Sequence, residues 1–170
     1  TRPVEGLRVA ASAPSPIVAV VAAGHPLAAQ SEASVIDLVG HPLALPEGSS
    51  TVRQVLDSAC ALAGTRYEVA CTGNLPTLIA LVQQGGLVML GSRMSVMHAL
   101  ADGSLKAVAL AEALFAQRQI QLLVREGRVS SDIAQAFVAQ AVAALASSGR
   151  LAARVVRPGG TPGPRRRGPA

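Results

Sequence analysis

The fold of this protein is decided by one stretch of its sequence, Asn74-Leu75-Pro76-Thr77-Leu78-Ile79-Ala80-Leu81-Val82-Gln83-Gln84-Gly85-Gly86-Leu87-Val88-Met89-Leu90. Its first apolar residues recur every third or fourth position, the period of a helix with one apolar face. Asn74 is a favoured N-cap residue, and Pro76 falls in the first turn, where a missing N–H is tolerated. Gly85 suits the left-handed position that follows a helix. The apolar run after Gly86 is typical of a strand buried on both faces of a parallel sheet.

A second strand precedes this helix. Tyr67, Val69 and Cys71 alternate with more polar or smaller residues, which predicts a strand with these three side chains on one face. Strand, helix and strand in succession make a βαβ unit, the connection that joins parallel strands.

The same alternation of strands and helices continues on both sides of this unit. Further strands are predicted near residues 7–9 and at 17–23, 42–45, 105–110 and 118–124. Further helices are predicted at 35–39 after Ser34, at 51–63 with Thr51 and Gln54 at capping-box spacing, at 92–101, and from Ser130 or Ser131 to about residue 146. The chain is therefore predicted to be an α/β protein with a mainly parallel sheet.

The positive charge is concentrated at one end of the chain. The formal net charge is +5, but the last 21 residues hold six arginines and no acid, and the first 149 hold nine basic and ten acidic side chains. The nearly neutral body lacks the electrostatic footprint of a nucleic-acid-binding protein. Residues 148–170 are predicted to form a disordered basic tail. No apolar run is long enough for a transmembrane helix.

Two loops carry the pattern of an anion-binding site. Each follows a predicted strand and precedes a helix, where free backbone N–H groups and the helix dipole favour a carboxylate or phosphate. The candidate ligand-binding residues are Ser49, Ser50 and Thr51 in the first loop and Thr72, Gly73 and Asn74 in the second. The alternative is that Ser50, Thr51 and Asn74 only cap their helices. Ser92 and Ser131 are expected to cap helices away from this site.

The remaining reactive residues are predicted to be structural. His25 and His41 each precede a proline and suit turns, and His98 lies in a short predicted helix. Cys60 and Cys71 are expected to be free, buried small hydrophobic residues. The sequence has no G-x-S-x-G motif, phosphate loop or usable Cys/His pair, which argues against an enzyme and predicts no catalytic residue, metal ligand or cofactor.

Several short motifs follow one another in a recognisable order. They are His25-Pro26-Leu27-Ala28, Ile36-Asp37-Leu38, Pro42-Leu43-Ala44-Leu45, Gly48-Ser49-Ser50, Arg53, Val55-Leu56-Asp57, Asn74, Leu81-Val82-Gln83-Gln84-Gly85 and Ala101-Asp102-Gly103-Ser104-Leu105. With these motifs, residues 17–147 resemble the effector-binding region of LysR-type transcriptional regulators. The resemblance implies a fold like the type II periplasmic binding proteins, with a small effector held between two α/β lobes hinged by crossing strands.

This template also implies a division of the chain. Residues 1–33 would be a partial first lobe, 34–118 the complete second lobe, and 119–147 the return to the first lobe with its C-terminal helix. The family's N-terminal winged helix-turn-helix has no counterpart in the chain, so DNA would be bound only through that missing part.

The implied function is ligand sensing in the bacterial cytoplasm. The effector would be a small anionic metabolite such as a carboxylate, and the full-length regulator would be a homo-oligomer, a dimer or tetramer, with no role at a membrane. The alternative is a solute-binding receptor of the periplasmic-binding-protein type. A signal peptide on the full gene would favour the receptor, and an upstream winged helix would favour the regulator.

Overall fold

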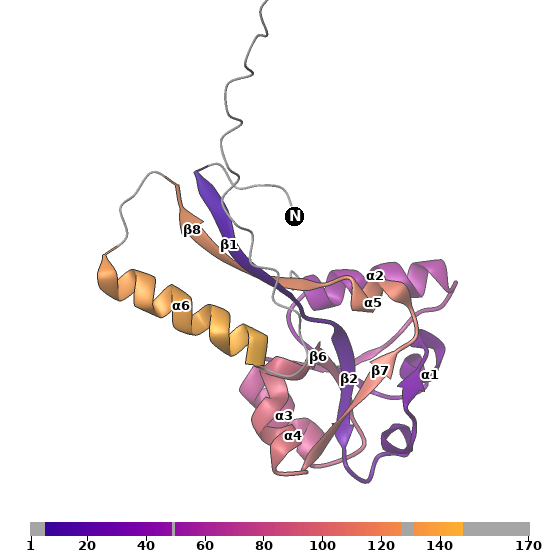
Figure 1. Cartoon of the computed structure of the whole chain (residues 1–170). Helices are drawn as coiled ribbons and strands as arrows, with labels where there is room; N and C mark the ends of the chain where they lie inside the picture. Colours follow the sequence, from indigo (N-terminus) through magenta and orange to yellow (C-terminus); the bar gives the residue numbers. More distant parts are fainter. Residues whose placement is uncertain (1–5, 49, 127–130, 148–170) are drawn as a thin grey trace, which may run out of the picture. The chain divides into compact units, whose positions relative to one another are not determined.

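The computed structural model describes residues 6–48, 50–126 and 131–147 (Figure 1). The strands are β1 (Leu7–Pro14), β2 (Ile17–Ala22), β3 (Glu32–Ala33), β4 (Leu43–Leu45), β5 (Val69–Thr72), β6 (Val88–Ser92), β7 (Leu105–Leu110) and β8 (Gln119–Arg125). The helices are α1 (Val35–Val39), α2 (Thr51–Leu62), α3 (Leu75–Gln83), α4 (Met97–Ala101), α5 (Ala113–Ala116) and α6 (Asp132–Ser147), with 3-10 turns η1 (Pro26–Ala29) and η2 (Arg93–Val96). The predicted α/β class is confirmed, and the predicted tail lies outside the described residues.

The chain divides into two compact units. One unit contains the residues up to Ala13 and those from Gln121 onward, and the other runs from Pro14 to Ile120. The template placed residues 14–33 with the first lobe. In the structure these residues lie in the larger unit, where β2 pairs with both β6 and β7 and β3 pairs with β7.

The smaller unit contains the two-stranded sheet β1–β8 and the helix α6. The backbone N–H of Glu126 donates to the carbonyl of Gly6 at 2.9 Å just beyond these strands. The hydroxyl of Ser131 accepts from the N–H of Ala134, so Ser131 caps α6 as one of the two predicted alternatives.

The larger unit is built on a six-stranded sheet in the order β3-β7-β2-β6-β4-β5. β4 is parallel to β5 and β6, β3 is parallel to β7, and β2 is antiparallel to both of its neighbours. Five strands therefore point the same way, with β2 reversed among them. The predicted βαβ unit is β5–α3–β6, with β4 lying between its two strands.

Helices cover both faces of this sheet (Figure 1). α1, α2 and α5 pack on one face through residues such as Leu38, Leu56 and Phe115. α3, η2 and α4 pack on the other through Leu78, Val82 and Val96. Alternate residues of the central strands face the two cores, as the pleat of a strand requires. The result is a three-layer α/β unit with an aliphatic core.

The helix of the organising stretch forms as its sequence predicts. Asn74 is the N-cap of α3, and its side-chain oxygen accepts from the N–H of Thr77 at 3.1 Å. Gly85 and Gly86 follow the helix with φ angles of +92° and +78°. These angles lie in the left-handed region that only glycine adopts without strain, so the chain turns directly from α3 into β6.

Two local predictions are wrong. The N-cap of α2 is Ser50, whose backbone is extended and whose hydroxyl oxygen accepts from the N–H of Arg53. Thr51 therefore begins the helix and is not the cap of a capping box with Gln54. Cys71 does not share a face with Tyr67 and Val69, because an irregularity in the β4–β5 ladder changes the phase of the strand.

The two cysteines are free, as predicted, and lie in different cores. Cys60 is 3% exposed on α2, and burial raises the pKa of its thiol, with further contributions from Asp57 and Glu112. Cys71 is only half-buried. A thiol with a raised pKa is a poor nucleophile, which suits the structural role expected of Cys60.

Candidate functional site

The two candidate loops lie at one edge of the large sheet. β4 ends at Leu45, which pairs with Thr72 at the end of β5, and the N–H of Gly73 donates to the Leu45 carbonyl at 3.4 Å. From this edge the chain enters α2 on one face of the sheet and α3 on the other. Loops that diverge to opposite faces at the carboxyl ends of parallel strands form the usual ligand site of α/β sheets.

Some of the described candidate residues cap a helix, and others lie beside these caps. Ser50 and Asn74 are N-caps, Thr51 is the first residue of α2, and Thr72 is exposed at the end of β5. Gly73 links Thr72 to Asn74 without a positive φ angle, so its backbone does not require glycine. Ser49 lies outside the described residues. The capping role is therefore present, and the question is which polar groups remain for a ligand.

Both caps keep hydrogen-bond donors available. The Ser50 oxygen accepts from Arg53, and because a hydroxyl is also a donor, its proton is left for another acceptor. The Asn74 oxygen accepts both the N–H and the hydroxyl of Thr77, which leaves the side-chain NH₂ group. Within the described residues, the N–H groups of Thr51 and Val52 have no partner, as expected for the first two positions of a helix.

The charge at these helix ends favours an external anion. Neither α2 nor α3 has an acidic residue in its first turn. α1 is the contrast, because its N-terminus is already occupied by carboxylates of the chain itself. Asp37 completes a capping box with Ser34, and Glu112 accepts from the N–H of Val35 at 2.7 Å. Among the described residues, no acidic side chain lies in the first turn of α2 or α3 to neutralise the positive end of the helix.

Sequence reasoning missed three residues at the same edge. β6 ends at Ser92, which pairs with Ile17 at the start of β2, so Ser92 does not lie away from the candidate site as expected. Ser15 and Arg118 lie next to this point: the Arg118 guanidinium donates to the Ser15 hydroxyl at 3.3 Å, and the Ser15 N–H donates to the Arg118 carbonyl. The strand-end rule could have found Ser92, since it directly follows a buried strand, whereas the sequence around Arg118 carries no comparable signal.

His25 and His41 lie near the opposite edge of the sheet, and His25 has a structural role there. His25 is 6% exposed and caps η1, with Nδ1 accepting from the N–H of Leu27 at 3.2 Å. Its ring meets that of His41 edge to face, with centroids 4.7 Å apart. A cavity of about 520 Å³ adjoins both rings. Among the described residues, no group of three or more His, Cys, Asp or Glu side chains is placed to hold a metal ion.

The cap made by His25 makes stability depend on pH. Burial, and secondarily His41, lower the pKa of His25 below the ordinary value of 6.5. The unfolded chain therefore takes up the proton first, and the free energy of unfolding should fall as the pH drops below about 6.5. Urea unfolding at a series of pH values should show this fall. His25→Asn keeps a capping oxygen without titrating, so it should reduce the pH dependence in this range. An unchanged dependence in that variant would contradict the assignment.

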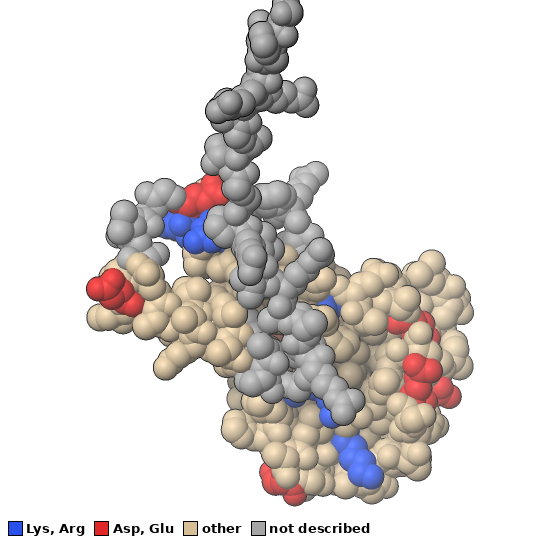
Figure 2. Space-filling model, in the orientation of Figure 1, with Lys and Arg blue, Asp and Glu red and all other residues tan. Residues whose placement is uncertain are grey.

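Figure 2 shows how charged side chains are spread over one face of the molecule. On the face shown, Lys, Arg, Asp and Glu are few and separated by broad uncharged areas over the described residues. This agrees with the nearly neutral body expected from the sequence. In the part of the chain that the structure describes, no helix is long and apolar enough to cross a membrane.

A comparison with protein-family models matches residues 2–146 to the LysR substrate binding domain. The chain belongs to this family. The resemblance drawn from the motifs is thereby confirmed, and members of the family are transcriptional regulators. A comparison with curated proteins returned no significant match.

Solved structures show the same fold. HinK, a LysR family transcriptional regulator from Pseudomonas aeruginosa, has a TM-score of 0.60 and 19% identity over 82% of this chain and 48% of its own. The effector binding domain of QuiR in complex with shikimate has a TM-score of 0.58 and 20% identity, over 79% and 65%. The CcmR regulatory domain of Synechocystis PCC6803 in complex with 2-PG has a TM-score of 0.63 and 17% identity, over 87% and 72%. This substrate-binding domain thus spans about half of HinK and about two thirds of the QuiR domain.

Proposed function

We propose that this chain is the effector-sensing part of a LysR-type transcriptional regulator, and that it binds a small anionic metabolite at the sheet edge framed by α2 and α3. The proposal rests on one observation: in a LysR substrate-binding domain, two neighbouring helices have no acidic residue in their first turn. Shikimate, which the QuiR domain binds, is itself a carboxylate, and this supports the same class of ligand.

The two loops are unequal partners in this site. α2 offers the N–H groups of Thr51 and Val52 and the Ser50 hydroxyl. In α3, Pro76 has no N–H and Thr77 is engaged by Asn74, so the loop contributes mainly the Leu75 N–H and the Asn74 amide. We therefore assign the anionic group to α2 and a neutral acceptor of the same ligand to Asn74. Arg118, which bonds Ser15 at this edge, would add long-range attraction.

The regulatory step would take place outside the residues described. Effector binding would be passed to a winged helix-turn-helix that supplies all sequence-specific DNA contacts. We propose that the full regulator works in the cytoplasm as a homo-oligomer.

A ligand titration tests the site. Shikimate, acetate and inorganic phosphate are added separately to the chain, and backbone amide signals are followed by NMR. We expect saturable shifts at Thr51, Val52 and Leu75 for at least one of these anions, with glycerol as the uncharged control. Saturable shifts confined to other residues, or none with any of the three anions, would overturn the proposed site.

A further inference from the structure

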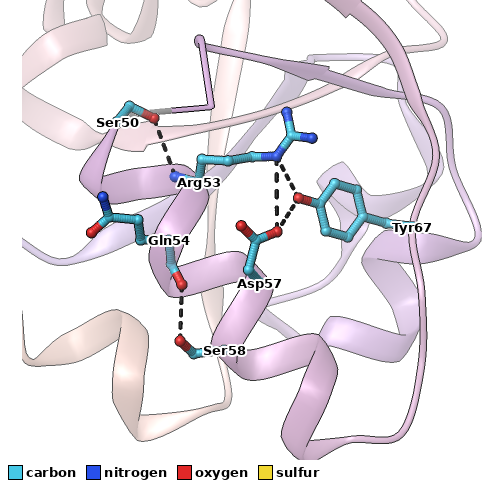
Figure 3. Close-up of polar contacts among 6 residues, drawn as sticks. All are labelled: Ser50, Arg53, Gln54, Asp57, Ser58 and Tyr67. Atoms are coloured by element: carbon cyan, nitrogen blue, oxygen red, sulfur yellow. Dashed lines mark hydrogen bonds and ion pairs between the residues drawn. The ribbon is translucent and has the colours of Figure 1, made fainter.

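A cluster of three side chains joins α2 to the segment that leads into β5 (Figure 3). The Tyr67 hydroxyl donates to Oδ1 of Asp57 and accepts from Nε of Arg53. The Arg53 guanidinium also lies over the Tyr67 ring, 5.1 Å from its centroid, and its Nε lies 3.9 Å from Oδ1 of Asp57. Arg53 and Asp57 stand one helical turn apart, so both reach the same hydroxyl. We call these three residues the clamp.

The strand that the clamp adjoins is weakly fixed by its own pairing. β5 has only four residues and is an edge strand, paired with β4 alone. The β4–β5 ladder is irregular between Leu43 and Ala44. Its side chains are at most half-buried. Register is strongly specified only where one face of a strand is deeply buried, so β5 needs another anchor.

We propose that the clamp sets the register of β5 and thereby positions Asn74 against the N-terminus of α2. This inference rests on the proposed anion site and assigns Arg53, Tyr67 and Asp57 to it as positioning residues. From Tyr67 the chain runs through β5 to Asn74, and a slip of one residue would move Asn74 by about 3.3 Å and turn alternate side chains to the other face. Such a shift exceeds the tolerance of a hydrogen bond.

Arg53 connects the two halves of the site through a single residue. Its backbone N–H donates to Ser50, which caps α2, and its side chain holds Tyr67 before β5. Arg53 is therefore part of both the cap of α2 and the clamp. Glu112 and Asp37 have no comparable link, since they serve the N-terminus of α1.

Tyr67→Phe is the sharpest test, because it removes only the shared hydroxyl and leaves the ring beneath Arg53. Two variants on the same helix serve as controls. Ser58→Ala removes an exposed hydroxyl bonded to the Gln54 carbonyl. Val55→Ala weakens the packing of α2 without changing a clamp residue. Hydrogen exchange of the β5 amides and the amide shifts of Thr72 to Asn74 are measured without ligand, and inorganic phosphate is then titrated.

We expect Tyr67→Phe to speed β5 exchange and to weaken phosphate binding, each by at least about fivefold, the worth of one of the two hydrogen bonds that the hydroxyl makes. Both control variants should keep the wild-type amide shifts of Thr72 to Asn74 and the wild-type phosphate affinity. Any change in their β5 exchange should be no larger than their loss of global stability explains. Equal changes in Tyr67→Phe and Val55→Ala, or unchanged β5 exchange in Tyr67→Phe, would overturn the clamp. If the wild type does not bind phosphate at α2, the anion site fails for phosphate, and the exchange data still decide the clamp.

Tyr67 also supplies a spectroscopic reporter of its own, because the chain has one tyrosine and no tryptophan. Burial, and then the hydrogen bond to Asp57, raise the pKa of Tyr67 above its ordinary value of 10. Asp57→Asn removes the negative charge, so the phenolate should appear at lower pH in an ultraviolet titration. An identical titration curve in this variant would show that Tyr67 does not face Asp57 and would overturn the clamp.

Discussion

Replacing Leu43 by alanine is expected to lower the free energy of unfolding by about 2–5 kcal/mol, the usual range for a buried leucine. Leu43 is fully buried in β4, the strand that pairs with both β5 and β6. The truncation would leave a cavity beneath α1 and α2, in a core whose only buried aromatic side chain among the described residues is Phe115. Urea unfolding followed by circular dichroism measures the loss.

The matched control for this change is Leu62→Ala. Leu62 is 80% exposed at the end of α2, so the same truncation removes almost no buried contact and should change stability by at most about 0.5 kcal/mol. Similar losses in the two variants would mean that β4 is not the packed centre of the sheet.

The elements that the sequence predicted well are those in which local and long-range preferences agree. β7 (Leu105–Leu110) has its predicted bounds, and α3 is capped by Asn74 and ends before Gly85 as predicted. In α3, the N-cap, the apolar period and the glycine all favour the same helix. The strands of the large sheet supply a surface on which its apolar face packs. Consistency at all levels is what makes such an element predictable.

The errors arise where one residue decides between two local solutions. Ser50 and Thr51 are both good N-cap residues, and only tertiary placement of the loop after β4 selects Ser50. The phase of β5 depends on an irregularity that involves β4, so the alternation in its own sequence misassigned Cys71. β2 runs antiparallel to β6 and β7, and a continuous apolar run carries no information on strand direction.

The candidate site was predictable in part. The rule that ligands bind beyond strand ends identified both loops, and the structure brings these strand ends side by side. The occupied N-terminus of α1 could not be predicted, because Glu112 reaches Val35 from 77 residues away in sequence. The clamp could not be predicted for a similar reason. Tyr67 contacts Arg53 and Asp57 across the turn between α2 and β5, and the spacing of these residues in the sequence does not predict that contact.

Replacing either N-cap residue of the candidate site by alanine is expected to have the largest effect on ligand binding. In Ser50→Ala and Asn74→Ala, each helix loses a cap worth about 1 kcal/mol of stability. Each variant also loses a donor that the structure leaves available to a ligand. A hydrogen bond to a charged ligand contributes roughly 1.5–3 kcal/mol, so the dissociation constant should rise about 10- to 150-fold in Ser50→Ala, which faces the anionic group. The rise should be smaller in Asn74→Ala. Calorimetric titration with the anion that binds the wild type measures both.

Ser34→Ala is the control that separates capping from binding. Ser34 caps α1 by accepting from the N–H of Asp37, as Ser50 caps α2, so the loss of stability should be similar. Its hydroxyl already donates to the Asp37 carboxylate at 2.7 Å, which leaves no donor for a ligand. Ser34 follows β3, which is separated from β4 by four inter-strand spacings in the sheet, roughly 19 Å at the usual spacing. Ser34→Ala should therefore lose stability and keep its affinity within about twofold. If Ser50→Ala behaves in the same way, the hydroxyl of Ser50 caps α2 and takes no part in recognising the anion.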